Sequence, residues 1–577
     1  MCGIAGIIGH QTKASRETAE AMMHSLKHRG PDDNGLWQSH DGETILAHTR
    51  LAISGDSEHG QQPMQYRHLV AVFNGEIHNH KELRKTLENL GHEFLPHQHT
   101  CDTEILLHAW LEWGLPGLDR INGMWAAAIH NIHTESTTLI RDRYGIKPLY
   151  YHSNKQQTVF ASEVKPIDLA TGYSLEPNFA GITPNSLFEP EWRTHLKSVY
   201  QLEAGHYVTI TPARCGVNRK WYHPKIETIP EGDHSQEFLQ KLSDACELRR
   251  DTAGLKTALC LSGGIDSNAL LAILTKLDTP PDKVFTLSLP GTEKDEARMA
   301  RDSAKISGVD IQVHALVSPP IDFLEKALAG CDGPMPTPDF LPIWAIHEII
   351  RKEGFKITID GMGSDELLGG YYIGEAAMAS AIQSKCLLRS ISLWRTYAAL
   401  YPQAWRWVSK DALRVLNKAQ LGADLVNIKR EIHHQMEKSP LPFLLNQYDR
   451  CSMSHGIETR TPFLDHNVVN FGLGLHESEI VGKGFTKLIL RKALKGLVRE
   501  EILKQKRKLG FTAAYSQWIN GPWKTWAQDL SNSQTFRNQP VLSTGYLAKQ
   551  IQQDKIPASR EVWTALHTTW WQINRKK

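Results

Sequence analysis

The sequence predicts an α+β first half, an α/β second half built on a parallel sheet, and a mostly helical end. Short strand-like runs separated by turn signals such as His40-Asp41-Gly42 fill residues 1–210. From about residue 236, apolar strands alternate with helical stretches, which is typical of parallel strands joined by crossover helices. After about residue 375 the pattern is mostly helical and rich in Trp and Leu.

The first half carries strand and helix patterns in alternation. The expected strands are Cys2–Ile8, Thr44–His48, Leu69–Phe73, Met124–Ile129, Thr138–Ile140 and Leu149–His152. The expected helices span residues 14–28, 79–91 and 102–114. Sheets that bury one face against helices give an α+β layer structure.

A linker is expected before the second half. The turn-rich strings Thr211–Gly216 and Ile229–Gly232 place it at residues 211–235, between a domain at 1–210 and a domain at 236–577. The apolar strands beyond it are expected at Lys256–Leu261, Val284–Leu289 and Lys356–Ile359. More than one domain also fits 577 residues, because domains usually hold about 100–200 residues.

Composition narrows the class of protein. The chain has 65 Lys and Arg against 63 Asp and Glu, so neither nucleic acid nor a membrane surface is expected as the main partner. No apolar run approaches the roughly 20 residues that span a bilayer, and the start does not have the pattern of a secretion signal. The eight cysteines are scattered along the chain, which predicts reduced thiols in a cytoplasmic protein.

Cys2 is the first candidate for chemistry. Removal of Met1 would leave a free α-amine on the same residue as the thiol. Such an amine has an ordinary pKa of about 7.7–8.0 and is able to act as general base for a nucleophile. The alternative interpretation of Cys2 is a small buried cysteine.

Polar residues elsewhere in the first half favour the nucleophile. A thiol that attacks an amide needs hydrogen-bond donors for the developing oxyanion, and the Asn74 side chain with the Gly75 N–H would supply two. Free glutamine needs an anchor at each end. The bidentate guanidinium of Arg50 suits its carboxylate, and Asp102 suits its amine.

A zinc site is the competing interpretation of one nearby string. His97-Gln98-His99-Thr100-Cys101 has a spacing that would suit zinc. No second ligand pair lies at a typical distance in the sequence, so the metal interpretation is not favoured.

Seven strings in order, up to residue 165, resemble the class II glutamine amidotransferase domain. They are Met1–Gly6, His28–Asp32, His48–Leu51, Phe73–Ile77, Cys101–Glu104, Arg141–Tyr150 and Ser162–Lys165. The resemblance implies a four-layer αββα N-terminal nucleophile sandwich. It also implies that Cys2 is the nucleophile and that Asn74 and Gly75 form the oxyanion hole. The residues that it assigns to glutamine binding are Arg50, Asn74, Gly75, Glu76 and Asp102.

A loop after the strand Leu255–Cys260 predicts a phosphate site. Its sequence is Leu261-Ser262-Gly263-Gly264-Ile265-Asp266-Ser267, and the helical stretch Asn268–Leu277 follows. Glycines let loop N–H groups and the new helix N-terminus face an anion, and two serine hydroxyls add donors. Asp266 fits beside phosphate only with Mg²⁺ between them. The alternative interpretation is a plain strand-to-helix turn. The loop is not a Walker loop, because no Gly-Lys-Ser/Thr closes it.

A second strand-to-turn string, Ile357–Glu366, carries further carboxylates. Asp365 would complete a Mg²⁺ site with Asp266. The first loop resembles the pyrophosphate loop of ATP pyrophosphatases. Further strings resemble the synthetase domain of asparagine synthetases: Leu368–Tyr371, Asp449–Glu458, Arg460–His466, Lys487–Arg491 and Arg507–Phe511.

The two resemblances together cover nearly the whole chain. The second implies an adenine nucleotide α-hydrolase-like fold with a helical C-terminal part. This resemblance gives Lys487 a catalytic role, which is to offset charge on the phosphates or the adenylate. Without the resemblance, the interpretation of Lys487 and Arg491 would be a solvated helix face. The residues that it assigns to ATP are Leu261, Ser262, Gly263, Gly264, Asp266, Ser267, Leu287, Asp360 and Gly361, of which Leu261, Leu287 and Gly361 border the adenosine.

These residues predict an amidation that consumes ATP and glutamine. ATP with Mg²⁺ would activate a carboxylate, aspartate first of all, as an acyl-adenylate with release of pyrophosphate. Ammonia freed by Cys2 would travel inside the protein, where a dry path keeps it unprotonated, and would displace AMP. The expected partners are therefore small molecules, and the family adds the expectation of a homodimer.

One segment, Gly330-Cys331-Asp332-Gly333-Pro334-Met335-Pro336, departs from the family pattern. Family members usually carry a glutamate here, at a position equivalent to Gly330 or Gly333. Asp332 and Asp339 are the possible substitutes. Four hypotheses follow: asparagine synthesis, amidation of another carboxylate, a cyclising synthetase without glutaminase, and a non-catalytic protein of this fold. The intact Cys2 and its partners speak against the last two.

Overall fold

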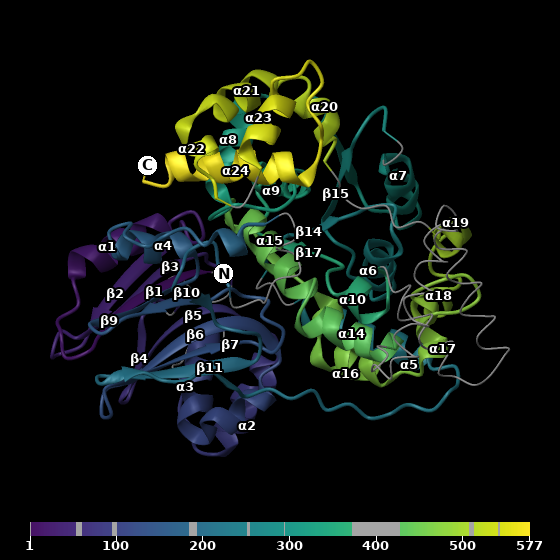
Figure 1. Ribbon diagram of the computed structural model, residues 1–577. Helices are drawn as coiled ribbons and strands as arrows, with labels where there is room; N and C mark the ends of the chain where they lie inside the picture. Colours follow the sequence, from purple (N-terminus) through teal and green to yellow (C-terminus); the bar gives the residue numbers. More distant parts are fainter. Residues whose placement is uncertain are drawn as a thin grey trace, which may run out of the picture.

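The computed structural model describes residues 2–53, 60–94, 101–183, 193–250, 254–292, 295–371, 427–506, 513–540 and 543–576. Two bodies lie side by side (Figure 1). The first, in purple and blue, holds two sheets with helices outside them, and the second, in teal to yellow, surrounds a separate sheet with helices.

The first sheet contains Cys2. Within the described ranges its strands are all antiparallel and run in the order β10-β8-β9-β1-β3-β2. Their bounds are β1 Cys2–Gly9, β2 Asp33–Gln38, β3 Thr44–Arg50, β8 Tyr150–Ser153, β9 Gln157–Ala161 and β10 Val199–Gln201.

The second sheet is also antiparallel, in the order β12-β11-β7-β6-β5-β4 with β13 paired to β11. Its strands are β4 Met64–Tyr66, β5 Leu69–Ile77, β6 Gly123–Asn131, β7 Ser136–Arg141, β11 His206–Thr211, β12 Arg214–Cys215 and β13 Arg219–Lys220. Because β12 and β13 pair with β11, the sheet continues beyond residue 210 into the segment expected as a linker.

Alternation along the strands builds four layers. In β1, Ile4 and Ile8 pack between the two sheets, whereas Ala5 and Ile7 face the helices outside, as the two-residue period of a strand requires. Helices lie outside both sheets (Figure 1). They are α1 Arg16–Ser25, α2 His80–Asn89, α3 Asp102–Trp113, α4 Val164–Ala170 and the short 3-10 turns η1 Leu115–Arg120 and η2 Phe179–Gly181. The αββα architecture expected from the sequence is confirmed.

The second body is built on a parallel sheet of order β16-β15-β14-β17-β18. Its strands are β14 Thr257–Cys260, β15 Lys283–Ser288, β16 Ile311–Ala315, β17 Ile357–Ile359 and β18 Glu458–Arg460. Helix α5 Ser235–Leu248 precedes these strands, and the described helices between them are α6 Ile265–Lys276, α7 Ala297–Ile306, α8 Ile321–Gly330, α9 Phe340–Lys352, α10 Ser364–Leu367, α14 Ile428–Glu437 and α15 Leu441–Met453. This is the α/β arrangement that the alternating pattern predicted.

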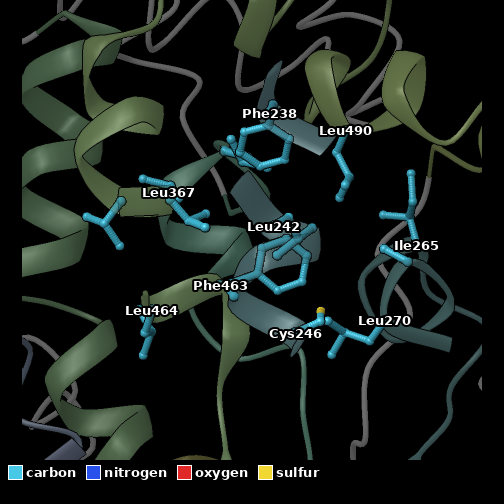
Figure 2. Close-up of a cluster of buried hydrophobic side chains, with 14 of the residues drawn as sticks. Phe238, Leu242, Cys246, Ile265, Leu270, Leu367, Phe463, Leu464 and Leu490 are labelled. Carbon is cyan, nitrogen blue, oxygen red and sulfur yellow. The ribbon is translucent and has the colours of Figure 1, made fainter. Parts of the chain in front are cut away.

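Apolar faces of these helices meet in one core. Figure 2 shows Phe238 and Leu242 of α5 beside Phe463 and Leu490, which come from much later in the chain. Burial of a large apolar side chain stabilises a fold by about 1.5–3 kcal/mol, so this cluster fixes the C-terminal helices against the sheet. Those elements are η5 Pro462–Leu464, α16 His466–Gly474, α17 Glu477–Ile480, α18 Leu488–Ala493 and α19 Glu500–Lys504. The later helices pack instead in another cluster, which includes residues of α8 and α9; they are α20 Tyr515–Ile519, α21 Lys524–Asn532, α22 Gln534–Arg537, α23 Thr544–Ile551 and α24 Arg560–Asn574.

Polar contacts join the two bodies. Arg29 pairs with Asp449 of α15 at 2.8 Å, and Asn122 donates to Asp465 at 2.8 Å. Lys356 pairs with Asp32 at 2.7 Å nearer the surface. None of the described helices combines the length and the apolar character needed to cross a bilayer.

Candidate active sites

The pairing of β1 with β3 positions the candidate nucleophile. Cys2 lies opposite Arg50, and Ile4 lies opposite His48. Residues that face each other across an antiparallel pair, and residues two apart on one strand, share a face of the sheet. Cys2, His48 and Arg50 therefore point to the same side, toward the second sheet.

Asn74 and Gly75 approach Cys2 from the second sheet. The Cys2 N–H donates to Asn74 Oδ1 at 3.0 Å. The Asn74 side chain is 0% exposed and its Nδ2 has no partner among the described residues. A buried donor without a partner is costly, so this amide is well suited to a developing oxyanion. At Gly75, which has φ 156°, a side chain would collide with the Met124 carbonyl.

A cavity of about 40 Å³ opens beside the thiol, and we call it the cysteine cavity. The residues proposed from the sequence that line it are Cys2, Arg50, Gly75, Glu76 and Asp102. Leu51 and Ile53 also line it, as does Cys101. The structure thus brings one cation, two carboxylates and the thiol together from β1, β3, β5 and the start of α3.

The thiol of Cys2 is more acidic than an ordinary cysteine. Burial raises its pKa, but the His48 imidazole and the positive charge of the amino terminus, together with a hydrogen bond from the Leu51 backbone, outweigh burial and hold the pKa at about 6. A thiolate is the nucleophilic form of cysteine, so Cys2 is largely reactive at neutral pH. Sequence reasoning did not assign His48, although the residue stands in one of the quoted strings.

The second body reaches into this site through β18. Arg460 is 1% exposed. Its guanidinium pairs with Glu76 and, at 2.7 Å, with Glu458. One buried guanidinium thus faces two carboxylates. Burial raises the pKa of Glu76 well above its ordinary value.

Asp102 belongs to the same group of charges. Burial and the nearby Glu458 raise the pKa of Asp102 to about 7. The cysteine cavity therefore holds more carboxylates than cations on this side, and an incoming ammonium group would relieve the imbalance. No signal for this role of Arg460 exists in the sequence beyond its place in the Arg460–His466 string.

A second cavity, of about 580 Å³, lies where β14 and β17 end, and we call it the lysine cavity. The predicted residues that line it are Ser262, Gly264, Asp266, Ser267, Asp360, Gly361, Asp365 and Lys487. Gly263 is outside this lining. The side chains of Leu261 and Leu287 are buried in hydrophobic clusters instead.

The loop after β14 is held by its own polar groups. The Ser262 N–H donates to Ser267 Oγ at 3.1 Å, and Asn268 Nδ2 donates to the carbonyls of Ser262 at 3.0 Å and Gly264 at 2.7 Å. At Gly361, an added Cβ would stand 2.9 Å from Asp266 Cβ. The glycine therefore lets the turns after β14 and β17 approach each other.

Lys487 forms ion pairs with both of the aspartates that are expected to hold Mg²⁺. Its Nζ lies 2.6 Å from Asp266 and 2.7 Å from Asp365. Lys487 is only 4% exposed, so the alternative of a solvated helix face is wrong for it. Burial lowers its pKa, but the two carboxylates outweigh burial and raise it. Arg491 also lines the cavity, and it donates to the Leu503 carbonyl at 2.8 Å.

Several residues of the lysine cavity were not foreseen. Met362, Tyr371, Gln447 and Tyr448 all line it. Burial raises the pKa of Tyr448 well above its ordinary value, which keeps the hydroxyl neutral. These residues come from separate elements, so no sequence pattern groups them.

The glycines of the 330–336 segment have no room for a side chain. A Cβ at Gly330 would stand 2.6 Å from Ser454 Oγ, and one at Gly333, which has φ 132°, would collide with the His195 ring. Neither lines the lysine cavity. Asp332 is used elsewhere, because its carboxylate accepts the N–H groups of Val164 and Lys165 at the start of α4. Of the two candidate substitutes, Asp339 alone lines the cavity.

The zinc alternative receives no support from the part of the chain that the structure describes. Residues 97–100 lie outside the described ranges. Cys101 is buried against the cysteine cavity, and burial raises the pKa of its thiol to about 11. No three His, Cys, Asp or Glu side chains gather into a metal site among the described residues.

Comparison with known families agrees with both cavities. Residues 1–222 match the family model described as a glutamine amidotransferase domain, and residues 237–573 match the one described as asparagine synthase. The chain belongs to the asparagine synthase family. It is an enzyme of the glutamine-hydrolysing asparagine synthase type, a carbon–nitrogen ligase that carries out a glutamine-dependent amidation.

Relatives span the whole chain at low identity. The glutamine-hydrolyzing asparagine synthetase 1 of Bacillus subtilis (strain 168) is 27% identical, over 100% of this chain and 97% of its own. Amidase chry2 of Gibberella zeae is 25% identical, over 96% and 94%. A solved structure of the allosteric regulatory enzyme of purine biosynthesis covers 56% of this chain and 81% of its own at 17% identity, with a TM-score of 0.32, which is too low to carry an argument.

Proposed function

We propose that this enzyme uses ATP and Mg²⁺ to convert a carboxylate into an acyl-adenylate, and that ammonia freed from glutamine by Cys2 displaces AMP to leave an amide. Aspartate is the first acceptor to consider, since several relatives are asparagine synthetases. The observation that carries the proposal is the presence in one chain of a cavity around an acidic thiol and a larger cavity around a buried lysine between two carboxylates.

The cysteine cavity supports glutamine hydrolysis. Cys2 would attack the side-chain amide, and Asn74 Nδ2 with the Gly75 N–H would bind the oxyanion, where loss of one donor costs about 2.7–4 kcal/mol in known cases. Arg50 would hold the glutamine carboxylate. Glu76 and Asp102 would hold its ammonium group in their ionised forms, and the bound ammonium would lower the pKa values that burial raises.

The lysine cavity supports the ATP half-reaction. The loop Ser262–Ser267, which includes Gly263 and Gly264, would cradle the pyrophosphate through its N–H groups. Asp360 and Gly361 would border the nucleotide. Since the Leu261 and Leu287 side chains are buried in hydrophobic clusters, their contact with the adenosine would be through the backbone. Lys487 would offset charge on the phosphates or on the adenylate.

The donor set fits Mg²⁺. Asp266 and Asp365 already face a shared cation in Lys487, and magnesium is usually held by one or two carboxylates plus substrate phosphates. These two side chains would hold the ion, which when bound neutralises charge on the phosphate oxygens.

An apolar cluster beside the cysteine cavity supports internal transfer of ammonia toward the lysine cavity. Leu51 and Ile53 line the cysteine cavity and pack with Ile357 of β17 and Met453 of α15. β17 leads directly to Asp360 of the lysine cavity. Apolar surroundings disfavour the protonated form of ammonia, so transfer along this cluster would keep it nucleophilic.

The test is pyrophosphate release with ATP, Mg²⁺ and glutamine while aspartate is varied. Aspartate-dependent release with formation of asparagine is expected. Cys2→Ala should lose release driven by glutamine and keep release driven by added ammonia. Glutaminase activity without any response to aspartate would remove aspartate as the acceptor and leave the amidation chemistry in place. Absence of glutaminase activity would point to the cyclising or non-catalytic hypotheses.

Amidation of another carboxylate is the second candidate. Two observations favour it: the relative named Amidase chry2, and the 330–336 segment, in which Gly330 and Gly333 leave no room for the glutamate usual in the family. Its test is the same assay with a panel of carboxylic acids in place of aspartate. Cytoplasmic location and a homodimer stay predictions.

A further inference from the structure

One face of helix α15 forms a wall of the lysine cavity. Leu444, Gln447 and Tyr448 all line the cavity, and their spacing of three and four residues places them on one face of the helix. The same helix reaches the apolar cluster beside the cysteine cavity through Met453, which lies about 9 Å from Gln447 along the axis of an α-helix. Helix α15 thus extends from the proposed path of ammonia to the lysine cavity.

Gln447 has a donor that the protein does not use. The residue is 4% exposed, and its Nε2 has no hydrogen-bond partner among the described residues. Buried polar atoms nearly always have a partner, and a buried donor without one is costly. The last side-chain torsion of glutamine is soft, so the NH₂ group is able to turn toward the cavity. The unpaired amide therefore indicates a ligand that accepts its hydrogen bond.

Other donors at the lysine cavity already contact the protein. The Lys487 ammonium lies between two carboxylates, and Arg491 donates to two backbone carbonyls. The Ser262 and Ser267 hydroxyls lie 3.1 Å from each other. Within the described lining, Gln447 carries the one buried N–H donor that has no partner.

The amidation step needs a donor of this kind. When ammonia attacks the acyl carbon of the adenylate, its lone pair forms the C–N bond and the carbonyl π electrons move to the oxygen, which becomes an oxyanion. Collapse restores the carbonyl, breaks the bond to the phosphate oxygen of AMP and releases one proton from the nitrogen to solvent. An N–H group directed at the acyl oxygen stabilises the oxyanion, as is proposed for Asn74 in the cysteine cavity.

We propose that Gln447 is a catalytic residue of the amidation step, in which its Nε2 donates to the acyl oxygen of the adenylate and stabilises the oxyanion as ammonia adds. This role rests on the proposed function. It assigns Lys487 to the phosphates and Gln447 to the acyl group. Gln447 has no such role in adenylate formation, because the carboxylate then attacks phosphorus and no carbonyl oxyanion arises.

The test measures the two half-reactions of Gln447→Met separately. Exchange of labelled pyrophosphate into ATP without a nitrogen source reports adenylate formation, and amide formed from added ammonia reports amidation. The acid is aspartate, or the acid of the panel that the unchanged protein uses. We expect exchange within about twofold of the unchanged protein and amide formation lowered by about 10²–10³-fold. An equal loss in both half-reactions, or no loss in either, overturns the inference.

A second buried glutamine provides the matched control. Gln435 on the neighbouring helix α14 is 3% exposed, has an unpaired Oε1 and lies outside the lining of both cavities, so Gln435→Met should leave both half-reactions unchanged. Removal of an unpaired buried donor is nearly neutral or stabilising. Gln447→Met, or Gln447→Leu if the first variant does not fold, should therefore keep the free energy of unfolding. A lower value in both, with both half-reactions weakened, would make Gln447 structural and overturn the inference.

Binding measured by calorimetry separates this inference from the proposed function. The probes are the aspartyl sulfamate of adenosine, an uncleavable mimic of the adenylate, and adenosine sulfamate, which lacks the acyl group. Gln447→Met should weaken binding of the acyl probe about fivefold and leave the other unchanged. That result supports the inference even if no acid is activated, which would instead overturn the adenylation.

The opposite results are also distinct. Equal affinity of the unchanged protein and Gln447→Met for the acyl probe overturns the inference and leaves the proposed function standing. Failure of both probes to bind the unchanged protein overturns the adenylation and the role of Gln447 together.

Discussion

The cysteine cavity and the lysine cavity both contain buried charged residues, but they differ in the balance between carboxylates and cations. In the cysteine cavity of about 40 Å³, carboxylates outnumber the cations beside them, and Asp102 has a pKa of about 7. In the lysine cavity of about 580 Å³, Lys487 sits between Asp266 and Asp365. In the cysteine cavity the ammonium group of a substrate can neutralise the excess carboxylate charge. In the lysine cavity the side chain of Lys487 already supplies the cation.

The difference also concerns how the sites are assembled. Strand register places Cys2 opposite Arg50, and packing of the two sheets of one body brings Gly75 beside them. The lysine cavity is made from turns after β14 and β17 and from the start of α18, which are far apart in the sequence. A sheet fixes its neighbours through backbone hydrogen bonds, but the turns depend on packing between helices.

Removal of the built-in cation should have the largest effect. Lys487→Met leaves Asp266 and Asp365 facing each other without a counter-charge, so pyrophosphate formation is expected to fall by about 10²–10³-fold, as for other lost electrostatic contacts in active sites. Glutamine hydrolysis should stay unchanged. The measurement is pyrophosphate and glutamate release from the same sample. Lys487→Arg is the control and should keep more pyrophosphate formation than Lys487→Met. Equal pyrophosphate formation by the unchanged protein and both variants would show that the lysine cavity does not need the charge of Lys487.

Arg460 tests the carboxylate excess of the cysteine cavity. Arg460→Met leaves Glu76 and Glu458 buried without their cation, and loss of one partner of a buried pair costs about 3–5 kcal/mol. We expect a lower free energy of unfolding in chemical denaturation and a higher KM for glutamine. The added change Glu458→Gln should restore part of both.

A second ion pair between the two bodies serves as the control for the loss of the Arg460 contact. Lys356 and Asp32 also join them, but near the surface, so Lys356→Met should cost no more than about 1 kcal/mol. If Lys356→Met and Arg460→Met lowered the free energy of unfolding equally, burial of the Arg460 ion pairs would not explain the effect of Arg460→Met.

His48 tests the acidity of the nucleophile. His48→Gln removes an interaction that lowers the pKa of Cys2 and leaves the burial that raises it, so this pKa should rise from about 6. The rate of Cys2 alkylation by iodoacetamide, followed from pH 5 to 9, should be about tenfold lower at pH 5 for each unit gained. Unchanged alkylation profiles for the two proteins would assign the low pKa to another group.

The smallest expected effect is the release of protons when glutamine binds. Near pH 7 Asp102 is partly protonated, because its pKa is about 7, and a bound ammonium lowers that pKa. Glutamine binding to Cys2→Ala should release less than one proton at pH 7, with weaker binding as pH falls and no release above about pH 9, where the carboxylate is already ionised. Calorimetry in buffers of different ionisation enthalpy measures this. Proton uptake would reverse the predicted sign.

Local patterns were enough to predict part of each site. Cys2 begins an apolar strand, Asn74 and Gly75 lie near the end of another, and Ser262–Ser267 join a strand to a helix. Each of these patterns reflects short-range geometry, such as the two-residue period of a strand or a glycine-rich turn. The layers of the first body and the parallel sheet of the second follow from the same periodicities.

The sequence by itself determined the chemistry available: a terminal thiol with donors and anchors, and a glycine-rich loop with carboxylates. Only the tertiary structure decided how charges balance. β18, whose Glu458 and Arg460 meet Glu76, has no apolar signal and lies in a region predicted as mostly helical. Likewise, Lys487 reads as a surface residue until its two carboxylate partners, more than 100 positions away in the chain, are brought against it. Burial and long-range pairing set these energies, and neither depends on the neighbours of a residue in the sequence.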